Sequence, residues 1–297
     1  MSADPTALDR PEGADSGSRA GPAPFRQLCT LSPLGEGRYG AHIDPMWTIG
    51  PKVHGGVMLA VTAAAARAEL RADAPDVAAG MQPIAASVDF QGAPDPGDVT
   101  LAVTVRKTGR QICLADVALM QGERTFVRSA VTLGFPEQTR PVHQIDGLTD
   151  MAVEPAANSD DYQGDSPMGK IVNVARGCHL RLDTTSAKFL SGELGEPAVR
   201  MWARPFDADD EDLDTRVLFA MMSADISPPV LMNLGQLGWA PTVQITTYLQ
   251  RIPAAGWLRV MSSAKSIGSV LFDEDHVLVD STGAVVAQSR QLAMAPK

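Results

Sequence analysis

The feature that most constrains this chain is an internal repeat with a fixed spacing of 159 residues. At that spacing the apolar helical pattern VHGGVMLAVTAAAARA (53–68) aligns with DLDTRVLFAMMSADIS (212–227) over its full length. The same shift aligns three pairs of turn residues, namely Pro94 with Pro253, Gly97 with Gly256 and Gly109 with Gly268. Because helices and turns keep one register, the sequence predicts two copies of the same structural unit.

Each copy consists of a helical pattern followed by three or four strand patterns joined by short glycine turns. The alternating pattern at 99–111, for example, has a similar pattern at 257–269 as its counterpart in the second copy. The first helix is alanine-rich and apolar nearly all round, so it needs burial on most faces. A curved sheet can supply that cover. The pattern predicts an α+β fold in which one continuous antiparallel sheet wraps around two central helices.

Two polar stretches divide the chain. Residues 1–24 are rich in Pro, Gly, Ala, Ser and Asp and offer little to bury, which predicts a disordered leader. Residues 135–170 have the composition of a linker. We therefore expect an N-terminal domain over 25–134 and a C-terminal domain over 171–297.

Charge and hydropathy exclude several classes of partner. The formal net charge of −10 argues against nucleic acid or an anionic membrane as the main partner. The longest apolar stretches are too short to span a bilayer, and the N-terminus lacks the order of a signal peptide, so we expect a cytoplasmic protein. The three cysteines, Cys29, Cys113 and Cys178, form no CxxC motif, and we expect ordinary thiols and no metal site.

Several stretches carry a resemblance to a known family: KVHGGVMLAVTAAA and SVDFQGAPDPGDVTLAVTVRKTGRQI in the first half, and MMSADISPPV, PTVQITTYLQR and VVAQSRQLAM in the second. From about residue 25 to the C-terminus, linker excepted, the sequence resembles the acyl-CoA thioesterase II (TesB-like) family. Members of that family carry two fused hotdog domains in one chain. The resemblance implies a double hotdog fold that hydrolyses fatty acyl-CoA without a cofactor, with catalytic residues in the C-terminal domain.

The family's hydrolases hold the attacking water with an Asp, a Ser or Thr, and a Gln. The positions of this sequence that match them are Asp225, Thr242 and Gln291. Thioester hydrolysis needs an aimed water, an acceptor for its proton and donors for the oxyanion, so this set suits the reaction. A covalent route through the carboxylate stays open. The segment between the Asp and the Thr is shorter than in the family, and Gln244 stands where an acidic residue often follows, which affects the pocket mouth.

The His54-Gly55-Gly56 stretch opens the first helix. Free backbone N–H groups at a helix start bind anions or polarised carbonyls, and glycine permits close approach. Gly56 or Val57 is therefore a candidate oxyanion donor. The alternative is that the glycines only permit tight packing, and that His54 is a structural residue rather than a second base.

Coenzyme A carries phosphates, so an acidic protein needs local cations to bind it. Arg106, Lys107 and Arg110 cluster at one glycine turn, and Lys265 occupies nearly the repeat-related place. They are candidate phosphate contacts, although charged turn residues are usually just solvated.

Three functions are compatible with these residues. A metal-free acyl-CoA thioesterase is favoured, and an inactive acyl-CoA or acyl-carrier binding protein is the alternative. A hotdog hydratase or dehydratase needs an Asp/His pair, and no histidine lies near Asp225 in the sequence. Open sheet edges also invite association into a homo-oligomer.

Overall fold

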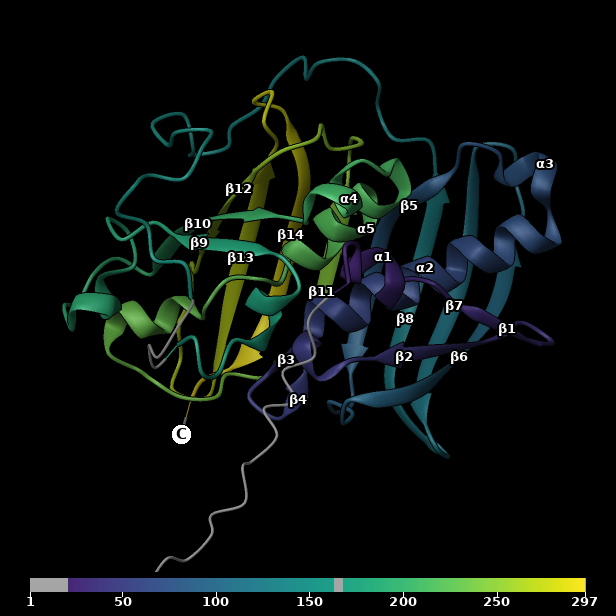
Figure 1. Ribbon diagram of the computed structural model, residues 1–297, viewed down its shortest axis with the longest axis horizontal. Helices are drawn as coiled ribbons and strands as arrows, with labels where there is room; N and C mark the ends of the chain where they lie inside the picture. The colour runs from purple at the N-terminus through teal and green to yellow at the C-terminus, as the bar shows by residue number, and fades with distance from the viewer. Residues whose placement is uncertain (1–20, 163–167, 297) are drawn as a thin grey trace, which may run out of the picture.

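The computed structural model describes residues 21–162 and 168–296, so most of the predicted leader lies outside the described residues. Among the described residues, twelve strands form one antiparallel sheet in the order β1-β2-β6-β7-β8-β5-β11-β14-β13-β12-β10-β9 (Figure 1). The strands of the first half are β1 (Ser32–Gly35), β2 (Arg38–Ile43), β5 (Gln82–Phe90), β6 (Gly97–Lys107), β7 (Ile112–Gln121) and β8 (Arg124–Gly134). Those of the second half are β9 (His179–Leu182), β10 (Ala198–Arg204), β11 (Thr242–Leu249), β12 (Leu258–Ser263), β13 (Leu271–Val279) and β14 (Val285–Met294).

The predicted repeat is visible in the strand order. From the centre outward, the first half runs β5, β8, β7, β6, β2, β1 and the second runs β11, β14, β13, β12, β10, β9. At the central seam, where β5 pairs with β11, Ser87 lies opposite Thr246, and their hydroxyl oxygens are 2.9 Å apart. These two residues are separated by the repeat spacing itself, so a pseudo-two-fold axis passes between them. The double hotdog fold predicted from the sequence is confirmed.

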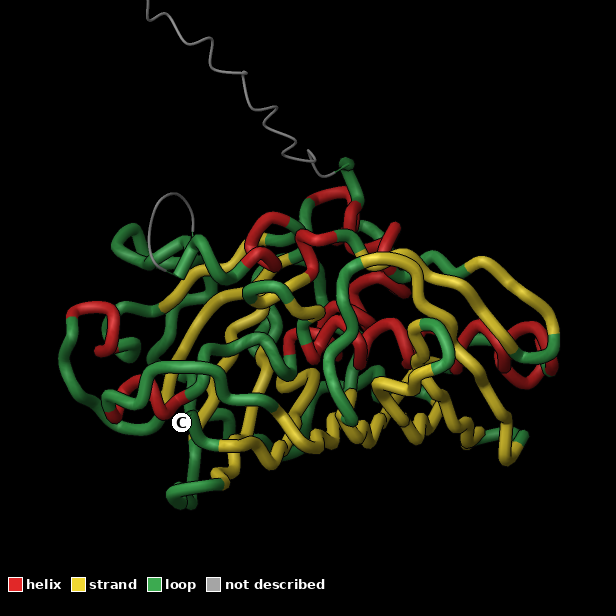
Figure 2. The backbone as a smooth tube through the Cα atoms, turned by 90° about the horizontal axis from the view of Figure 1, so that it is seen from below, coloured by secondary structure: helices red, strands yellow, loops and turns green. Residues whose placement is uncertain are grey.

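Two antiparallel helices, α2 (Gly55–Asp73) and α5 (Leu213–Ser223), lie against the concave face of the sheet (Figure 2). The alanine-rich middle of α2 is buried on all sides, and its small side chains let the sheet approach closely. The first helix begins two residues later than the predicted pattern and extends further, to Asp73. The second ends at Ser223, so Asp225 lies just beyond the helix rather than within it.

Shorter elements complete the described part of the chain. They are the helices α1 (Pro24–Leu28), α3 (Pro75–Ala78) and α4 (Asp207–Asp210), the 3₁₀ turns η1 (Pro45–Trp47), η2 (Asn173–Arg176), η3 (Lys188–Ser191) and η4 (Val230–Leu234), and the small ribbon of β3 (Thr48–Ile49) and β4 (Lys52–Val53). None of the helices in the described part of the chain is long and apolar enough to cross a membrane.

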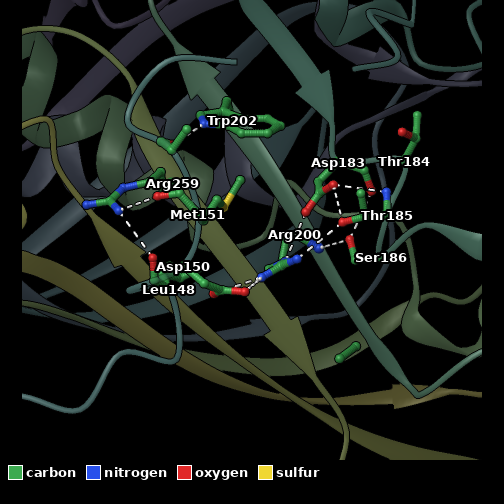
Figure 3. A network of polar contacts seen from close by, with 12 residues as sticks. Leu148, Asp150, Met151, Asp183, Thr184, Thr185, Ser186, Arg200, Trp202 and Arg259 are labelled. Atoms are coloured by element: carbon green, nitrogen blue, oxygen red, sulfur yellow. Dashed lines mark hydrogen bonds and ion pairs between the residues drawn. The ribbon is translucent and has the colours of Figure 1, made fainter. Parts of the chain in front are cut away.

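Part of the segment predicted as a linker, around Leu148 and Met151, packs on the face of the sheet that points away from the helices. Leu148 and Met151 form an apolar cluster with Trp202 of β10, separate from the main core. Figure 3 shows how it is held: Arg259 donates to the carbonyls of Leu148 (3.2 Å) and Met151 (2.9 Å). The Trp202 indole N–H donates to the Ala152 carbonyl (2.9 Å). This part of the connection is therefore docked on the second half.

Candidate active site

Asp225 lies where the end of α5 meets the start of α2. A side chain at Gly55 would collide with the Asp225 carboxylate, and one at Gly56 would collide with the Met222 carbonyl of α5. The two glycines are thus required by the close approach of the helices, which supports the packing interpretation of the HGG stretch. The same closeness places the Asp225 carboxylate at the N-terminus of α2.

Burial raises the pKa of Asp225 to about 7, and hydrogen bonding from the Gly56 N–H opposes that rise. The Thr242 oxygen also lies within hydrogen-bonding reach of the carboxylate, but its proton is donated to Gln291. Helix α2 has no side-chain cap of its own, and its first intrahelical bond runs from the Met58 N–H to the His54 carbonyl (3.2 Å). Asp225 therefore caps α2 from the loop that follows α5. The Gly56 amide is engaged by this carboxylate, whereas Val57 follows it in the same turn and is fully buried.

Thr242 lies beside Asp225, and Gln291 lies beside Thr242 on the adjacent strand. Thr242 begins β11 and Gln291 lies near the end of β14, and the Thr242 hydroxyl donates to the Gln291 Oε1 over 2.9 Å. A β-bulge between Thr242 and Gln244 shifts the register of β11 here. Bulges re-aim side chains near functional sites. The three residues matched from the family resemblance thus come together from three separate elements.

His54 also reaches this site. Its Nε2 lies 2.9 Å from the Asp225 carbonyl oxygen, and because a carbonyl can only accept, Nε2 carries the proton. Burial lowers the pKa of His54 to about 4, so the ring is neutral at pH 7. The two residues are 171 positions apart, so their proximity could not be predicted from local sequence pattern.

A second buried acid, Glu274 of β13, lies behind Gln291 and was missed in the sequence. Its Oε2 accepts from the Gln291 Nε2 at 2.9 Å, its exposed fraction is 1%, and burial raises its pKa to about 8. A signal was present: Phe272, Glu274, His276 and Leu278 alternate along one strand face, so an acid and a histidine occupy apolar positions. Their repeat-related residues are Ala115 and Val117, both buried and apolar.

The four candidate phosphate contacts do not converge. Arg106 pairs with Asp116 (2.9 Å) and Lys265 pairs with Asp275 (2.9 Å), which are repeat-related ion pairs. Six strands lie between β6 and β12 in the sheet order. Phe90 lies beside Gly55, and the sheet register places Leu101 of β6 level with Phe90. Lys107 is six residues further along β6, which is about 20 Å from that level at the usual rise of a strand. Arg110 lies in the turn after Lys107.

Comparison with known proteins identifies the family of the chain. The model of the acyl-CoA thioesterase N-terminal domain matches residues 43–134, and that of the acyl-CoA thioesterase C-terminal domain matches residues 148–295. The chain belongs to the acyl-CoA thioesterase family. The uncharacterized protein Rv0499 of Mycobacterium tuberculosis is 41% identical over 269 residues, covering 86% of this chain and 89% of that protein.

Solved structures show the same fold. A hot dog fold protein of unknown function from Alicyclobacillus acidocaldarius superimposes with a TM-score of 0.72 and 17% identity, covering 92% of this chain and 98% of that one. The tesB protein of Mycobacterium avium subs paratuberculosis gives a TM-score of 0.68 and 18% identity, with coverage of 92% and 98%. The range of this chain that matches the C-terminal domain of the family, residues 148–295, includes Asp225, Thr242 and Gln291.

Proposed function

We propose that this protein hydrolyses fatty acyl-CoA to a free fatty acid and coenzyme A, with Asp225, Thr242 and Gln291 holding the attacking water. The observation that supports this most directly is the position of Thr242, which lies beside Asp225 at the start of α2 and also contacts Gln291. A carboxyl of raised pKa beside two neutral polar groups is the arrangement that a general base requires.

In the proposed reaction the water oxygen attacks the thioester carbonyl while Asp225 accepts a water proton. A tetrahedral oxyanion forms, the C–S bond then breaks, and the thiolate of coenzyme A takes up the proton. Thr242 and Gln291 are uncharged, so they orient the water without repelling the developing negative charge. The positive end of the α2 dipole, with the Val57 amide, is our candidate for stabilising the oxyanion.

The test is thiol release from a panel of acyl-CoAs of increasing chain length, with the wild type and Asp225→Asn compared in one assay. We expect turnover by the wild type and a fall of about 10²–10⁴-fold in the variant, the usual contribution of a general base. Absence of thiol release at every chain length, with acyl-CoA still bound, would leave a binding protein without turnover as the function.

A dehydratase or hydratase is the second candidate, and the position of His54 favours it. The sequence alone disfavoured this function because no histidine lies near Asp225, yet the structure places the His54 ring against the Asp225 backbone. Hydration of a 2-enoyl-CoA, followed by loss of the conjugated thioester absorbance, distinguishes the two reactions. Loss of that absorbance without thiol release would replace the thioesterase proposal.

A further inference from the structure

Glu274 belongs to a chain of hydrogen bonds that runs beneath the loop carrying Asp225. At one end the Ser289 hydroxyl is 2.6 Å from the Ala224 carbonyl, next to Asp225 in the sequence. Ser289 Oγ also lies 3.1 Å from His276 Nδ1, and His276 Nε2 lies 2.9 Å from Ser227 Oγ. Ser227 Oγ is in turn 3.5 Å from Glu274 Oε1.

The direction of this chain follows from its first member. A carbonyl cannot donate, so the single Ser289 proton points to Ala224, and Ser289 must accept from His276 Nδ1. Burial lowers the pKa of His276 to about 4, so the ring is neutral and its Nε2 is an acceptor. The Ser227 proton therefore goes to His276, so only a lone pair of Ser227 Oγ faces Glu274 Oε1 at 3.5 Å.

Burial favours a proton on Glu274, and the Ser227 lone pair facing Oε1 acts in the same direction, whereas hydrogen bonds from the Gln291 amide and the Val230 N–H oppose it. With the proton on Oε1, Oε2 is the acceptor for the Gln291 amide. The amide orientation is then fixed, with Nε2 toward Glu274 and Oε1 toward Thr242, in agreement with the two 2.9 Å contacts. The Thr242 proton is directed to Gln291, and the lone pairs of its oxygen remain for other donors.

We propose that Glu274 is a positioning residue held as a neutral acid, which sets the orientation of Gln291 and Thr242 and anchors the loop that bears Asp225. This inference rests on the proposed thioesterase function and adds a residue to it. With the Thr242 proton turned toward Gln291, both Thr242 and the ionised Asp225 accept from the attacking water. The two water protons are then occupied, and a lone pair is left to face the thioester carbonyl.

Glu274→Gln and Glu274→Leu test the inference, because an amide reproduces the donor and acceptor of a neutral acid and a leucine reproduces neither. We expect kcat within about threefold of the wild type for the glutamine variant and a loss of about 10²-fold for the leucine variant, the cost of misplaced catalytic groups. KM should change little in either. Asp275→Asn is the matched control, since Asp275 is adjacent on β13 but pairs with Lys265 on the opposite face.

The pH profile separates positioning from a merely structural role. Two groups besides Glu274 are titratable here: Asp225, which faces it from the loop after α5, and His276 on its own strand. Because the active form carries the Glu274 proton and burial raises that pKa to about 8, wild-type kcat should fall above this pH. Glu274→Gln should lose the alkaline fall and keep the acid limb that belongs to Asp225.

Three results would overturn the inference: a glutamine variant as inactive as Asp225→Asn, a leucine variant as active as the wild type, or an alkaline fall that persists in Glu274→Gln.

Thermal unfolding gives a readout that needs no substrate. Between about pH 4.5 and 8 only the folded state holds the Glu274 proton, so wild-type stability should decline with pH in this window relative to Glu274→Gln. If no acyl-CoA is hydrolysed, the proposed function fails, and the stability measurement still tests Glu274. Equal slopes of stability against pH for the wild type and Glu274→Gln would refute the neutral acid.

Discussion

The two central helices begin in opposite ways, although the repeat makes their N-termini equivalent. At α2 the first residue is Gly55, and the carboxylate of Asp225 caps the helix from outside. At α5 the helix is capped locally, by the Asp212 side chain accepting from the Thr215 N–H (2.8 Å). The residue equivalent to Gly55 is Asp214, and the residue equivalent to Asp225 is Ala66.

The start of α5, next to Ala66 of α2, is the location equivalent to the Asp225 site. We call it the closed location because an ion network occupies it. Asp214 accepts from Arg71 (2.6 Å) and from Gln82 (2.6 Å), and Arg67 lies 3.4 Å from the same carboxylate. Burial alone would raise the Asp214 pKa, but the Arg71 and Gln82 hydrogen bonds and the Arg67 charge lower it to about 2. Asp225 has no such partner among the described ion pairs, and burial raises its pKa to about 7. The start of α5 thus lies beside a carboxylate that is ionised at neutral pH, whereas the equivalent start of α2 lies beside one that exchanges a proton near neutral pH.

The largest effect is expected from placing a carboxylate at the closed location. Ala66→Asp puts an acid at a position with no exposed surface, opposite Asp214 rather than opposite a glycine. Burial of an unpaired polar group should lower the free energy of unfolding by about 2–7 kcal/mol. Denaturant titration measures this, with Ala66→Ser as the milder control. Wild-type stability in Ala66→Asp would mean that the two locations do not differ in their tolerance of a carboxylate.

The next effect tests the space that Gly55 provides. Gly55→Ala should displace the Asp225 carboxylate, because the new methyl group would collide with it. We expect kcat to fall by about 10²-fold with the fold retained, as for other small displacements of catalytic groups. Gly21→Ala, in open surroundings, is the control. Steady-state kinetics with circular dichroism would decide, and full activity in Gly55→Ala would show that the tight contact is dispensable.

A smaller effect concerns the acid limb of activity. If ionised Asp225 is the base, kcat/KM should rise with pH through the Asp225 pKa of about 7 and fall about tenfold per pH unit below it. The same raised pKa lowers stability as pH rises from about 4 to 7, because only the unfolded state releases the proton there. A flat kcat/KM between pH 5 and 8 would contradict the assignment of Asp225 as base.

The smallest effect is expected at the ion network itself. Asp214→Asn should leave kcat unchanged and lower stability by about 1 kcal/mol, since the partial exposure of Asp214 and Arg71 weakens their pairing. In the wild type this contribution is present above about pH 4 and is lost as pH falls toward 2. Thermal unfolding at neutral and acid pH measures both. A large loss of kcat would link the closed location to the reaction.

Much of the fold could be predicted from the sequence, because helix and strand periodicity and turn glycines recur at one spacing. Asp225, Thr242 and Gln291 could be named only through the family resemblance, since Thr242 and Gln291 look like ordinary strand residues. The contact of His54 with Asp225 depends on the packing of two helices far apart in the chain, which local pattern does not encode. Glu274 was visible as a polar residue on an apolar strand face, but its partner Gln291 became apparent only from strand register.

The pairing of Ser87 with Thr246 marks an axis that relates two segments of one chain rather than two molecules. In a dimer of identical subunits one mutation appears in both subunits, so a change that suits one of the two symmetry-related sites also alters the other. Here the positions equivalent to Glu274 and Gln291 are Ala115 and Val131, which vary independently of them. Because both halves are encoded in one chain, selection can act on catalysis at the end of the helix pair that carries Asp225 and on stability at the end that carries Asp214.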